Sequence, residues 1–379
     1  MPDLHNARVL VTGGAGFIGS HLVDLLRTER NAEVTILDNL EPQTHRGKPP
    51  WVPKDVRFIA GDVRNPQDLL TALEGVRYVF HLAAFGGFTE ASSKYLDVNA
   101  TGTVRLYETI FEHHLPVEKI VVASSQGVYG EGAYVSPTGD LLLSVPFRRP
   151  LEQLRRKQWE HLDAATGEPL LSIPTPETKP ADTYHVYAVA KLAAERASLT
   201  LGRQWHLPTC ALRYSVTYGP RQSIYNPYTG VASIFSTQIL SGHRPQVYED
   251  GNQTRDFLYV EDNVRGNLFA MEHEETADRI FNLATGRATS VRELVLLLSE
   301  LIGERCEPLV PGHFRPTDVR HIVLDPSELA SLGFQPKSSL REGLGRFVAW
   351  IREQPDVEDL FSGSQQRLIA TGVVHVADE

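Results

Sequence analysis

The chain has 379 residues, 41% of them hydrophobic and 22% charged, which provides enough apolar material for two folded lobes and excludes a largely disordered protein. The formal net charge of −10 argues against nucleic acid as the main partner, although local arginines could still bind an anionic small ligand. The two cysteines form no CxxC pair, which suits a reducing cytoplasm and provides no disulfide framework.

The sequence has no feature typical of a membrane protein or a metal site. The first residues lack a basic segment followed by a long apolar core, and no run of about 18 apolar residues occurs, so we expect neither a secretory signal nor a membrane span. The histidines are scattered, and the adjacent His113 and His114 would point apart on an expected helix. We therefore expect no metal.

The first 130 residues alternate short β-branched segments with helical patterns. Strands are expected at 8–13, 33–38, 56–62, 76–84 and 119–125, and helices at 17–30, 66–73 and 92–114. Buried strands of this kind, separated by helices, indicate a doubly wound parallel sheet with helices on both faces.

Residues 133–173 break this rhythm with prolines, a basic run and an isolated tryptophan, Trp159. We interpret this insert as an excursion or lid rather than a unit of the sheet. The basic run is more typical of a solvated helix face than of a binding site.

The rest of the chain predicts a smaller C-terminal α/β lobe. A helix is expected at about 183–205, a strand at 209–214, a helix near 233–240, strands at 244–250 and 255–262, and helices near 263–272 and 291–302. We expect a first domain over 1–212 that carries the insert, a second lobe over most of 213–355, and a loosely attached tail over 356–379.

Three glycines, Gly13, Gly16 and Gly19, lie between the first strand and the first helix. The first permits a tight turn, the second lets the main chain approach a diphosphate, and the third lets the helix pack on the strand. The N–H groups and partial positive charge at the start of that helix would attract phosphate. The pattern is that of a Rossmann dinucleotide-binding fold, and a packing turn without a nucleotide is the alternative.

An acidic residue, Asp38, ends the second strand 19 residues after Gly19, where a carboxylate can accept hydrogen bonds from the adenosine ribose. Because a carboxylate there would repel a 2′-phosphate, NAD is favoured over NADP. Asp62, at the end of the third strand, is placed to meet the adenine.

The segment YHVYAVAK contains two tyrosines that compete for a catalytic role. Tyr187 stands four residues before Lys191, so both share one helix face, whereas Tyr184 is two turns away from the lysine. A phenol with a pKa of about 10 is a poor base at neutral pH, and a nearby ammonium favours its phenolate. Ser125, at the end of the fifth strand, could hydrogen-bond the same substrate oxygen, because ligands of such sheets bind at the carboxyl ends of strands. A packing role for the tyrosine is the alternative.

Seven segments occur in an order that resembles the extended short-chain dehydrogenases/reductases that act on nucleotide sugars: TGGAGFIG, HLAA, VNATGT, SSQGVYG, YAVAK, YGPRQ and RDFLYVED. The resemblance covers residues 8–336. It implies Ser125, Tyr187 and Lys191 as the catalytic triad, with Tyr187 as the base. It also implies bound NAD and a C-terminal lobe that binds a nucleoside diphosphate.

Within that family the chain is similar to bacterial nucleotide-sugar 4-epimerases of the dTDP-L-rhamnose and UDP-galactose type, which share segments at 128–132, 174–177, 226–231 and 249–257. Many such proteins carry cysteine pairs in the insert, and this chain has none there, so no metal is implied. The usual YGxSK is YAVAK here, which keeps the two chemical groups. Val216 stands where an asparagine commonly contacts the substrate diphosphate region.

Carried over position by position, the resemblance implies two sets of binding residues. The NAD set is Gly13, Gly16, Phe17, Ile18, Gly19, Asp38, Asn39, Asp62, Val63, Leu82, Ala83, Ala84, Asn99, Tyr187, Lys191 and Tyr214. The substrate set is Ser125, Gln126, Val216, Arg221, Asn226, Arg255 and Arg315. Guanidinium groups suit phosphate oxygens, but Arg255 and Arg315 could instead pair with the aspartates at 256 and 318. Asn99 is either structural or in contact with the cofactor.

The residues after Ser125 separate the possible reactions. Dehydratases of this fold have an acidic pair there and decarboxylases often a glutamate, whereas this chain has Gln126 and Gly127, so elimination lacks its proton donor. We expect a 4-epimerase that oxidises C4 of a nucleotide sugar transiently and returns the hydride to the opposite face. A nucleotide-sugar ketoreductase or dehydrogenase and a non-enzymatic nucleotide-sensing module are the alternatives. Family members usually pair through two helices, so a homodimer is expected.

Overall fold

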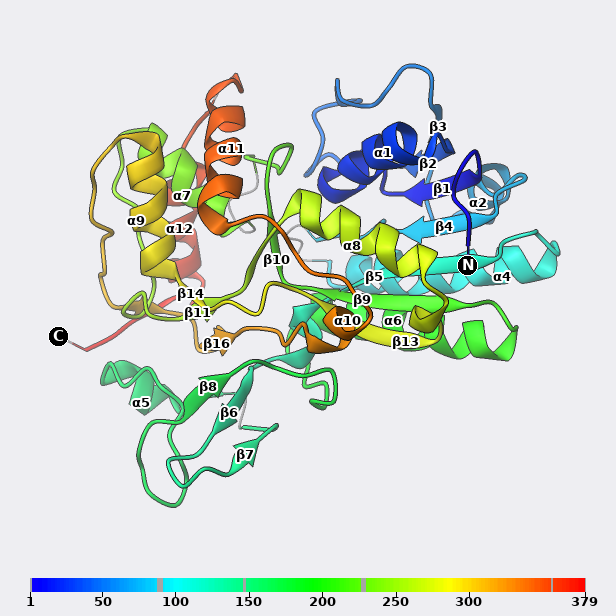
Figure 1. The fold of residues 1–379 in the computed structure, drawn as a ribbon. Helices are drawn as coiled ribbons and strands as arrows, with labels where there is room; N and C mark the ends of the chain where they lie inside the picture. The colour runs from blue at the N-terminus through cyan, green and yellow to red at the C-terminus, as the bar shows by residue number, and fades with distance from the viewer. Residues whose placement is uncertain (1, 87–90, 146–147, 226–229, 356, 379) are drawn as a thin grey trace.

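The computed structural model describes residues 2–86, 91–145, 148–225, 230–355 and 357–378. Asn226, one of the expected substrate-binding residues, lies outside the described residues. Figure 1 shows a large lobe built on a twisted sheet, a smaller lobe beside it, and a short sheet that projects below them in this view.

Within the described residues, the large lobe is built on a sheet of seven strands in the order β13-β9-β5-β4-β1-β2-β3. The strands are β1 (Arg8–Thr12), β2 (Glu33–Asp38), β3 (Arg57–Ala60), β4 (Tyr78–His81), β5 (Lys119–Ser125), β9 (Thr209–Tyr214) and β13 (Arg279–Leu283). All neighbouring strands are parallel. The chain winds from β1 to β3 on one side and from β4 to β13 on the other. This confirms the doubly wound sheet and puts its switch point between β1 and β4, where ligands of such folds bind.

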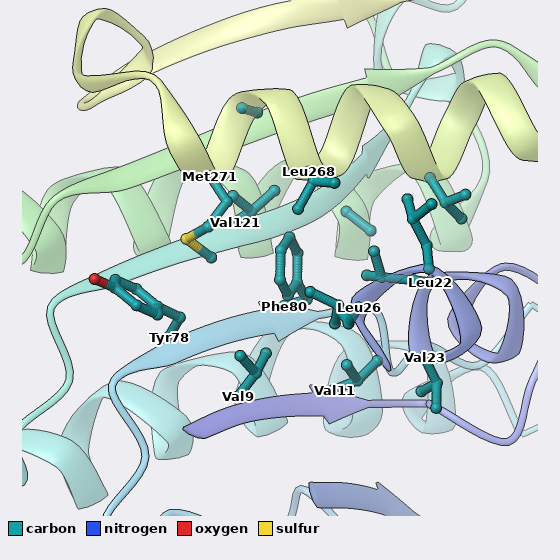
Figure 2. Packing of buried hydrophobic residues seen from close by; sticks show 14 of the residues in the cluster. Val9, Val11, Leu22, Val23, Leu26, Tyr78, Phe80, Val121, Leu268 and Met271 are labelled. Carbon is teal, nitrogen blue, oxygen red and sulfur yellow. The ribbon is translucent and has the colours of Figure 1, made fainter. Parts of the chain in front are cut away.

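Both faces of this sheet are buried, as its continuously apolar strands predict. In β1, Val9 and Val11 join one apolar cluster and Leu10 joins another, because alternate residues of a strand point to opposite faces. The first face is covered by α1 (Phe17–Arg30) and α8 (Val260–Glu272), which pack through Leu22, Leu26, Leu268 and Met271 (Figure 2). The second face is covered by α2 (Pro66–Ala72), α4 (Gly102–Glu112) and α6 (Val186–Gln204).

The smaller lobe packs helices and one of its short sheets around an apolar cluster, and a further short sheet lies beside them. The helices are α7 (Val231–Leu240), α9 (Val291–Ile302) and α11 (Leu340–Arg352). Strand β10 (Val216–Tyr218) pairs with β12 (Phe257–Tyr259), and β11 (Thr254–Arg255) lies between β14 (Thr289–Ser290) and β16 (His321–Ile322). Helix α9 occupies the expected range, because Ser290 and Glu293 form a capping box at its start and Gly303, with a φ of +83°, ends it.

Two sequence-based expectations about elements are wrong. The helix expected over 92–114 is divided into α3 (Ser93–Tyr95), a π-helical turn (Leu96–Thr101) and α4. Residues 244–250 form a turn and a single bridge rather than a strand, because Glu249 and Asp250 turn toward Arg320. The remaining connecting elements are 3-10 turns at Gln126–Tyr129 and Glu274–Thr276, and α10 (Ser327–Ser331).

The insert folds into a small antiparallel sheet with one short helix. Its elements are β6 (Ala133–Val135), β7 (Leu141–Leu142), α5 (Leu151–Arg155) and β8 (Leu171–Ile173), with β6 in the middle of the sheet. Arg155, Arg156 and Lys157 of the basic run are exposed, as a solvated helix face requires.

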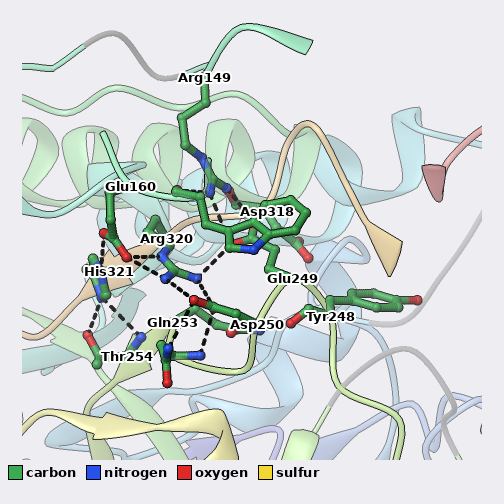
Figure 3. A network of polar contacts seen from close by, with 12 residues as sticks. Arg149, Glu160, Tyr248, Glu249, Asp250, Gln253, Thr254, Asp318, Arg320 and His321 are labelled. Carbon is green, nitrogen blue, oxygen red and sulfur yellow. Dashed lines mark hydrogen bonds and ion pairs between the residues drawn. The ribbon is translucent and has the colours of Figure 1, made fainter. Parts of the chain in front are cut away.

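Buried ion pairs join the insert to the smaller lobe (Figure 3). Arg149 of the insert lies 2.7 Å from Glu249. Arg320 of the smaller lobe lies 2.8 Å from Glu249 and also binds Asp250 and Glu160, the last from the insert. The insert is therefore docked on the smaller lobe and is not a free lid.

Residues 357–378 are packed, contrary to the expected loosely attached tail. Helix α12 (Leu360–Ala370) buries Phe361 and Leu368, which share one helix face because they are seven residues apart. Strand β17 (His375–Val376) pairs with β15 (His313–Phe314). Among the described residues, no helix combines the length and apolar character needed to cross a membrane.

Candidate active site

A cleft of about 410 Å³ opens at the carboxyl edge of the large sheet, around its switch point. The expected binding residues that line it are Gly13, Gly16, Phe17, Ile18, Gly19, Asp38, Asn39, Val63, Leu82, Ala83, Ala84, Tyr187, Lys191, Tyr214 and Arg221. Those that do not line it are Asp62, Asn99, Ser125, Gln126, Val216, Arg255 and Arg315. Most of the expected NAD residues thus converge on one cleft, whereas most of the expected substrate residues lie around or beyond it.

The glycine loop fits a dinucleotide diphosphate. Gly13 has a φ of +70°, and a Cβ atom there would lie 2.9 Å from the main chain of Ala83. A Cβ atom on Gly19 would lie 2.2 Å from the Gly13 carbonyl oxygen, so α1 can approach this closely only through glycine. Helix α1 starts at Phe17, after Gly16, without a side-chain cap, which leaves N–H donors at its start for an anion.

Asp38 is 8% exposed and lines the cleft at the end of β2. Its carboxylate accepts hydrogen bonds from the Ala15 N–H (3.0 Å) and the Leu40 N–H (2.9 Å). It therefore ties the glycine loop to β2, and a carboxylate at this place is compatible with ribose hydroxyls and unfavourable to a 2′-phosphate.

Asp62 does not line the cleft and binds its neighbours instead. It accepts hydrogen bonds from the Arg64 guanidinium (2.7 and 2.9 Å) and from the Asn39 amide (3.0 Å). Burial alone would raise the pKa of Asp62, but the hydrogen bonds from Arg64 lower it to about 2. Asp62 thus holds Asn39 in place. Asn39 lines the cleft, whereas Asp62 does not.

Helix α6 sets the positions of Tyr187 and Lys191. The Nδ1 atom of His185 accepts a hydrogen bond from the Ala188 N–H at 3.1 Å, so the helix begins at Val186 rather than at 183. Tyr187 and Lys191 then line the cleft one helical turn apart.

The other tyrosine of the segment, Tyr184, precedes the helix and does not line the cleft. It packs against Gly130, where a Cβ atom would lie 2.8 Å from the tyrosine ring. Burial raises the pKa of Tyr184 well above its usual range. Of the two tyrosines, Tyr187 is the one that faces the cleft.

Burial favours the neutral forms of both Tyr187 and Lys191. It lowers the pKa of Lys191 to about 8, and the Lys191 Nζ atom donates to the Ala123 carbonyl oxygen at 2.8 Å. Burial raises the pKa of Tyr187, and a hydrogen bond with Ser125 offsets part of that effect. Desolvated groups with shifted pKa values on the wall of a cleft are typical of proton-transfer sites.

Ser125 ends β5, and its Oγ atom accepts a hydrogen bond from the Gly127 N–H at 3.1 Å. Its hydrogen bond with Tyr187 puts it at the tyrosine hydroxyl, although it does not line the cleft. The next residue, Gln126, has a buried Oε1 atom without a hydrogen-bond partner among the described residues.

Arg255 is engaged by the main chain and lies outside the cleft lining. Its guanidinium donates to the carbonyl oxygens of Thr254 (2.8 Å), Val319 (2.7 Å) and Arg320 (3.1 Å). The alternative partner, Asp256, instead accepts hydrogen bonds from Thr285 and Gly286.

Arg315 and Arg221 differ in their access to the cleft. Arg315 lies 4.7 Å from the centre of the Tyr248 ring and 3.9 Å from Asp318, and its buried Nε atom has no hydrogen-bond partner in the described part of the chain. Arg221 lines the cleft and lies 2.8 Å from Asp24.

Asn99 and Val216 contact neighbouring main chain. The Asn99 side chain accepts from the Phe85 N–H (2.7 Å) and donates to the Phe85 carbonyl oxygen (3.0 Å), so it fixes a residue that lines the cleft. The Val216 N–H donates to the Asp256 carbonyl oxygen at 3.0 Å.

The cleft also has lining residues that were not among the expected binding residues. Val98, Ser124 and Gln222 belong to the quoted family segments. The others are Leu37, Glu41, Gln43, Thr44, His45, Trp51, Gly61, Phe85, Gly86, Ala123, Ser223, Ile224, Tyr225, Trp350 and Gln354. Many come from loops, where the sequence offers little signal except the large apolar residue Trp51. No group of three or more side chains placed to hold a metal occurs in the described parts of the chain.

Comparisons with known proteins agree with this geometry. Over residues 9–154 and 164–284 the chain matches the NAD dependent epimerase/dehydratase family. It is 36% identical over 358 residues to the dTDP-L-rhamnose 4-epimerase of Burkholderia thailandensis, which covers 92% of this chain and 96% of that protein. The UDP-glucose 4-epimerase of Thermotoga maritima with UDP-glucose gives a TM-score of 0.74 at 32% identity, covering 91% of this chain and 99% of that one. The UDP-glucose 4-epimerase of Thermus thermophilus in complex with NAD gives 0.72 at 32% identity, covering 92% and 100%. These matches confirm the resemblance carried by the motifs: the chain belongs to the NAD dependent epimerase/dehydratase family.

Proposed function

We propose that the protein is a nucleotide-sugar 4-epimerase that keeps NAD bound between turnovers. The observation that carries this proposal is the meeting of Tyr187 and Lys191 on the wall of a cleft that also contains a diphosphate cradle, with Ser125 at the tyrosine hydroxyl. Relatives of the same architecture are 4-epimerases, one of them in complex with NAD.

Tyr187 is the base in this proposal. It takes the proton of the sugar C4 hydroxyl, Ser125 hydrogen-bonds the same oxygen, and protonated Lys191 stabilises the phenolate. Bound NAD would supply a reversible hydride acceptor, and the 4-ketosugar would turn over in the cleft so that the hydride returns to the opposite face of C4. Because Tyr187 gives its proton back to the oxygen in the second half of the reaction, the protein ends the cycle unchanged.

The neutral residues after Ser125 favour reversible oxidation at C4 over dehydration. Gln126 and Gly127 cannot protonate a leaving hydroxyl, so dehydration lacks its acid. The Oε1 atom of Gln126 is buried without a partner among the described residues, but Gln126 does not line the cleft, so its contact with the substrate stays a prediction.

Two arginines support a nucleoside diphosphate as the part of the substrate that the protein would bind. Arg221 lines the cleft, and Arg315 keeps a buried Nε donor that no described residue accepts. Guanidinium donors suit phosphate oxygens. Arg255, whose donors are occupied by carbonyl oxygens, is a weaker candidate and would act by holding the segment around Arg320.

We also propose that the protein is a cytoplasmic homodimer. Phe111 of α4 is 49% exposed and stacks on Trp205 with ring centres 4.4 Å apart, and Val189 of α6 is 41% exposed. Apolar side chains exposed on adjacent helices support a four-helix interface between two copies.

Incubation with a panel of UDP-, dTDP- and GDP-sugars in deuterated water, without added cofactor, tests the function. We expect a C4 epimer that carries no solvent deuterium at C4, because the hydride returns inside the cleft. A requirement for stoichiometric NADH would support a ketoreductase instead. Deuterium at C3 or C5 would indicate enolisation and contradict the proposal.

A further inference from the structure

Residues 39–52 connect β2 to β3 and are called the strap below. Asn39, Glu41, Gln43, Thr44, His45 and Trp51 of the strap line the cleft. The strap contains no helix or strand, so side-chain contacts determine where it lies (Figure 1, blue loop beside α1).

Both ends of the strap are attached to the large lobe. Near its start, the Glu41 carboxylate lies 2.9 Å from the Lys94 Nζ atom, and that ammonium lies 4.3 Å from the centre of the Phe85 ring. Near its end, the Trp51 indole N–H donates to the carbonyl oxygen of Ala15, in the glycine loop, at 3.0 Å. These contacts hold the strap against the edge of the dinucleotide cradle.

The middle of the strap contacts the other lobe. The guanidinium of Arg46 lies 3.7 Å from the centre of the Tyr225 ring, which is a cation–π contact. Tyr225 follows β10 and lines the cleft from the smaller lobe. The contact therefore joins two segments that enclose the cleft from different lobes.

The segment that carries Tyr225 is itself fixed to the large lobe. The Pro220 carbonyl oxygen lies 2.9 Å from the His21 Nε2 atom, and Arg221 lies 2.8 Å from Asp24, both on α1. The start of the segment that carries Tyr225 is thus tied to α1. Because Arg46 is exposed and packs on a ring, its contact is easier to break than the half-buried anchors of the strap.

We propose that the strap retains the dinucleotide in the cleft and that the contact between Arg46 and Tyr225 is the latch that opens before the nucleotide leaves. The inference rests on the proposed function in one respect: an epimerase that lost its reduced cofactor in mid-reaction would be left with an oxidised sugar. Retention of the nucleotide is therefore a need of this reaction, and a ketoreductase that exchanges its cofactor at every turnover would have no such need.

Release of NADH from the loaded protein tests the latch. The holoprotein is loaded with NADH, mixed with a large excess of NAD⁺, and the loss of bound NADH fluorescence is followed with time. We expect Arg46→Ala to release NADH about 2- to 30-fold faster than the unchanged protein. This range corresponds to the free energy that a cation–π contact contributes. Tyr225→Ala should give the same acceleration, the double variant no more than either single one, and Tyr225→Phe, which keeps the ring, none.

A matched control separates the latch from a general loss of positive charge. Lys48 belongs to the same strap, but its ammonium lies 4.4 Å from the centre of the Phe58 ring and it does not line the cleft. Lys48→Ala should release NADH at the unchanged rate. Equal release rates for Arg46→Ala and Lys48→Ala would overturn the proposal, as would additive effects in the double variant. No sugar is present, so the outcome does not depend on whether the protein is an epimerase.

Discussion

The cleft and the junction between the insert and the smaller lobe both bury titratable side chains, but they treat charge in opposite ways. At the junction, Arg320 is 1% exposed and is surrounded by carboxylates, among them Glu249, which is 3% exposed. In the cleft, Lys191 is 5% exposed, yet its ammonium donates to a main-chain carbonyl oxygen. Pairing shifts the pKa values of buried groups toward their charged forms and holds two parts of the fold together, whereas burial without a partner of opposite charge shifts the pKa toward the neutral form and makes the group available for proton transfer.

Removing the phenol of Tyr187 should have the largest effect, because it deletes the group that moves the proton. We expect Tyr187→Phe to lower kcat by about 10²- to 10⁴-fold. Turnover is measured by the appearance of the C4 epimer, with the melting temperature and bound NAD content followed alongside. Both of these should stay near their original values.

Tyr184→Phe is the matched control for this variant. This variant also removes a tyrosine hydroxyl, but Tyr184 lies three residues before Tyr187 and its side chain does not line the cleft. The variant should therefore retain most of the activity. If Tyr184→Phe lost activity as strongly as Tyr187→Phe, the assignment of the base would fail.

Breaking the junction should cost stability rather than chemistry. Arg320→Met leaves buried carboxylates without their partner, and we expect the free energy of unfolding to fall by ~3–5 kcal/mol. Urea denaturation measures this change. Arg341→Met, which breaks an ion pair with Glu300 whose side chains are 57% and 62% exposed, should cost far less, because water screens exposed ion pairs. Similar losses in the two variants would contradict the contrast between buried and exposed pairs.

The parts of the fold that follow from local pattern could be predicted from the sequence. Alternation of apolar strands and helices predicted the large sheet, and the helical pattern over 291–302 predicted α9. The packing of residues 357–378 and the division of the helix over 92–114 were missed, because tertiary contacts decide both.

The candidate site divides in the same way. The glycine loop, Tyr187 and Lys191 depend on short-range spacing, and they line the cleft as expected. Arg149 belongs to the insert that we interpreted as an excursion or lid, and its partner Glu249 is 100 residues away in the chain, so no local pattern indicated this ion pair. The strap was missed for the same reason, since its contact with Tyr225 joins segments that no spacing rule connects.

The buried ammonium of Lys191 should make the protein more stable as the pH rises. Its pKa is lowered by burial to about 8, whereas an unfolded lysine has a pKa of about 10.4. Between these values the unfolded chain binds more protons, so the free energy of unfolding should rise by about 2 kcal/mol from pH 8 to pH 10 on account of this residue. Urea denaturation of cofactor-free protein should show this rise relative to Lys191→Met. If the free energy of unfolding changed with pH in the same way in both proteins, Lys191 would not be an uncompensated buried charge.

The junction should show a dependence of the same sign, in which stability also rises with pH, but in the acid range and with a smaller change in the free energy of unfolding. Burial opposes ionisation of Glu160, but hydrogen bonds from His321 and Arg320 lower its pKa to about 2, below the value of about 4.3 in an unfolded chain. Its contribution to stability is therefore complete above about pH 4.3 and is lost as the pH falls toward 2. The difference in unfolding free energy between the unchanged protein and Glu160→Gln should shrink between pH 6 and pH 3. We expect a modest change, because the Glu160 side chain is 33% exposed and water screens its ion pairs.

Glu152→Gln, in an exposed pair with Arg156, should show little change over this range. A constant difference for Glu160→Gln would mean that the insert is held by packing rather than by charge.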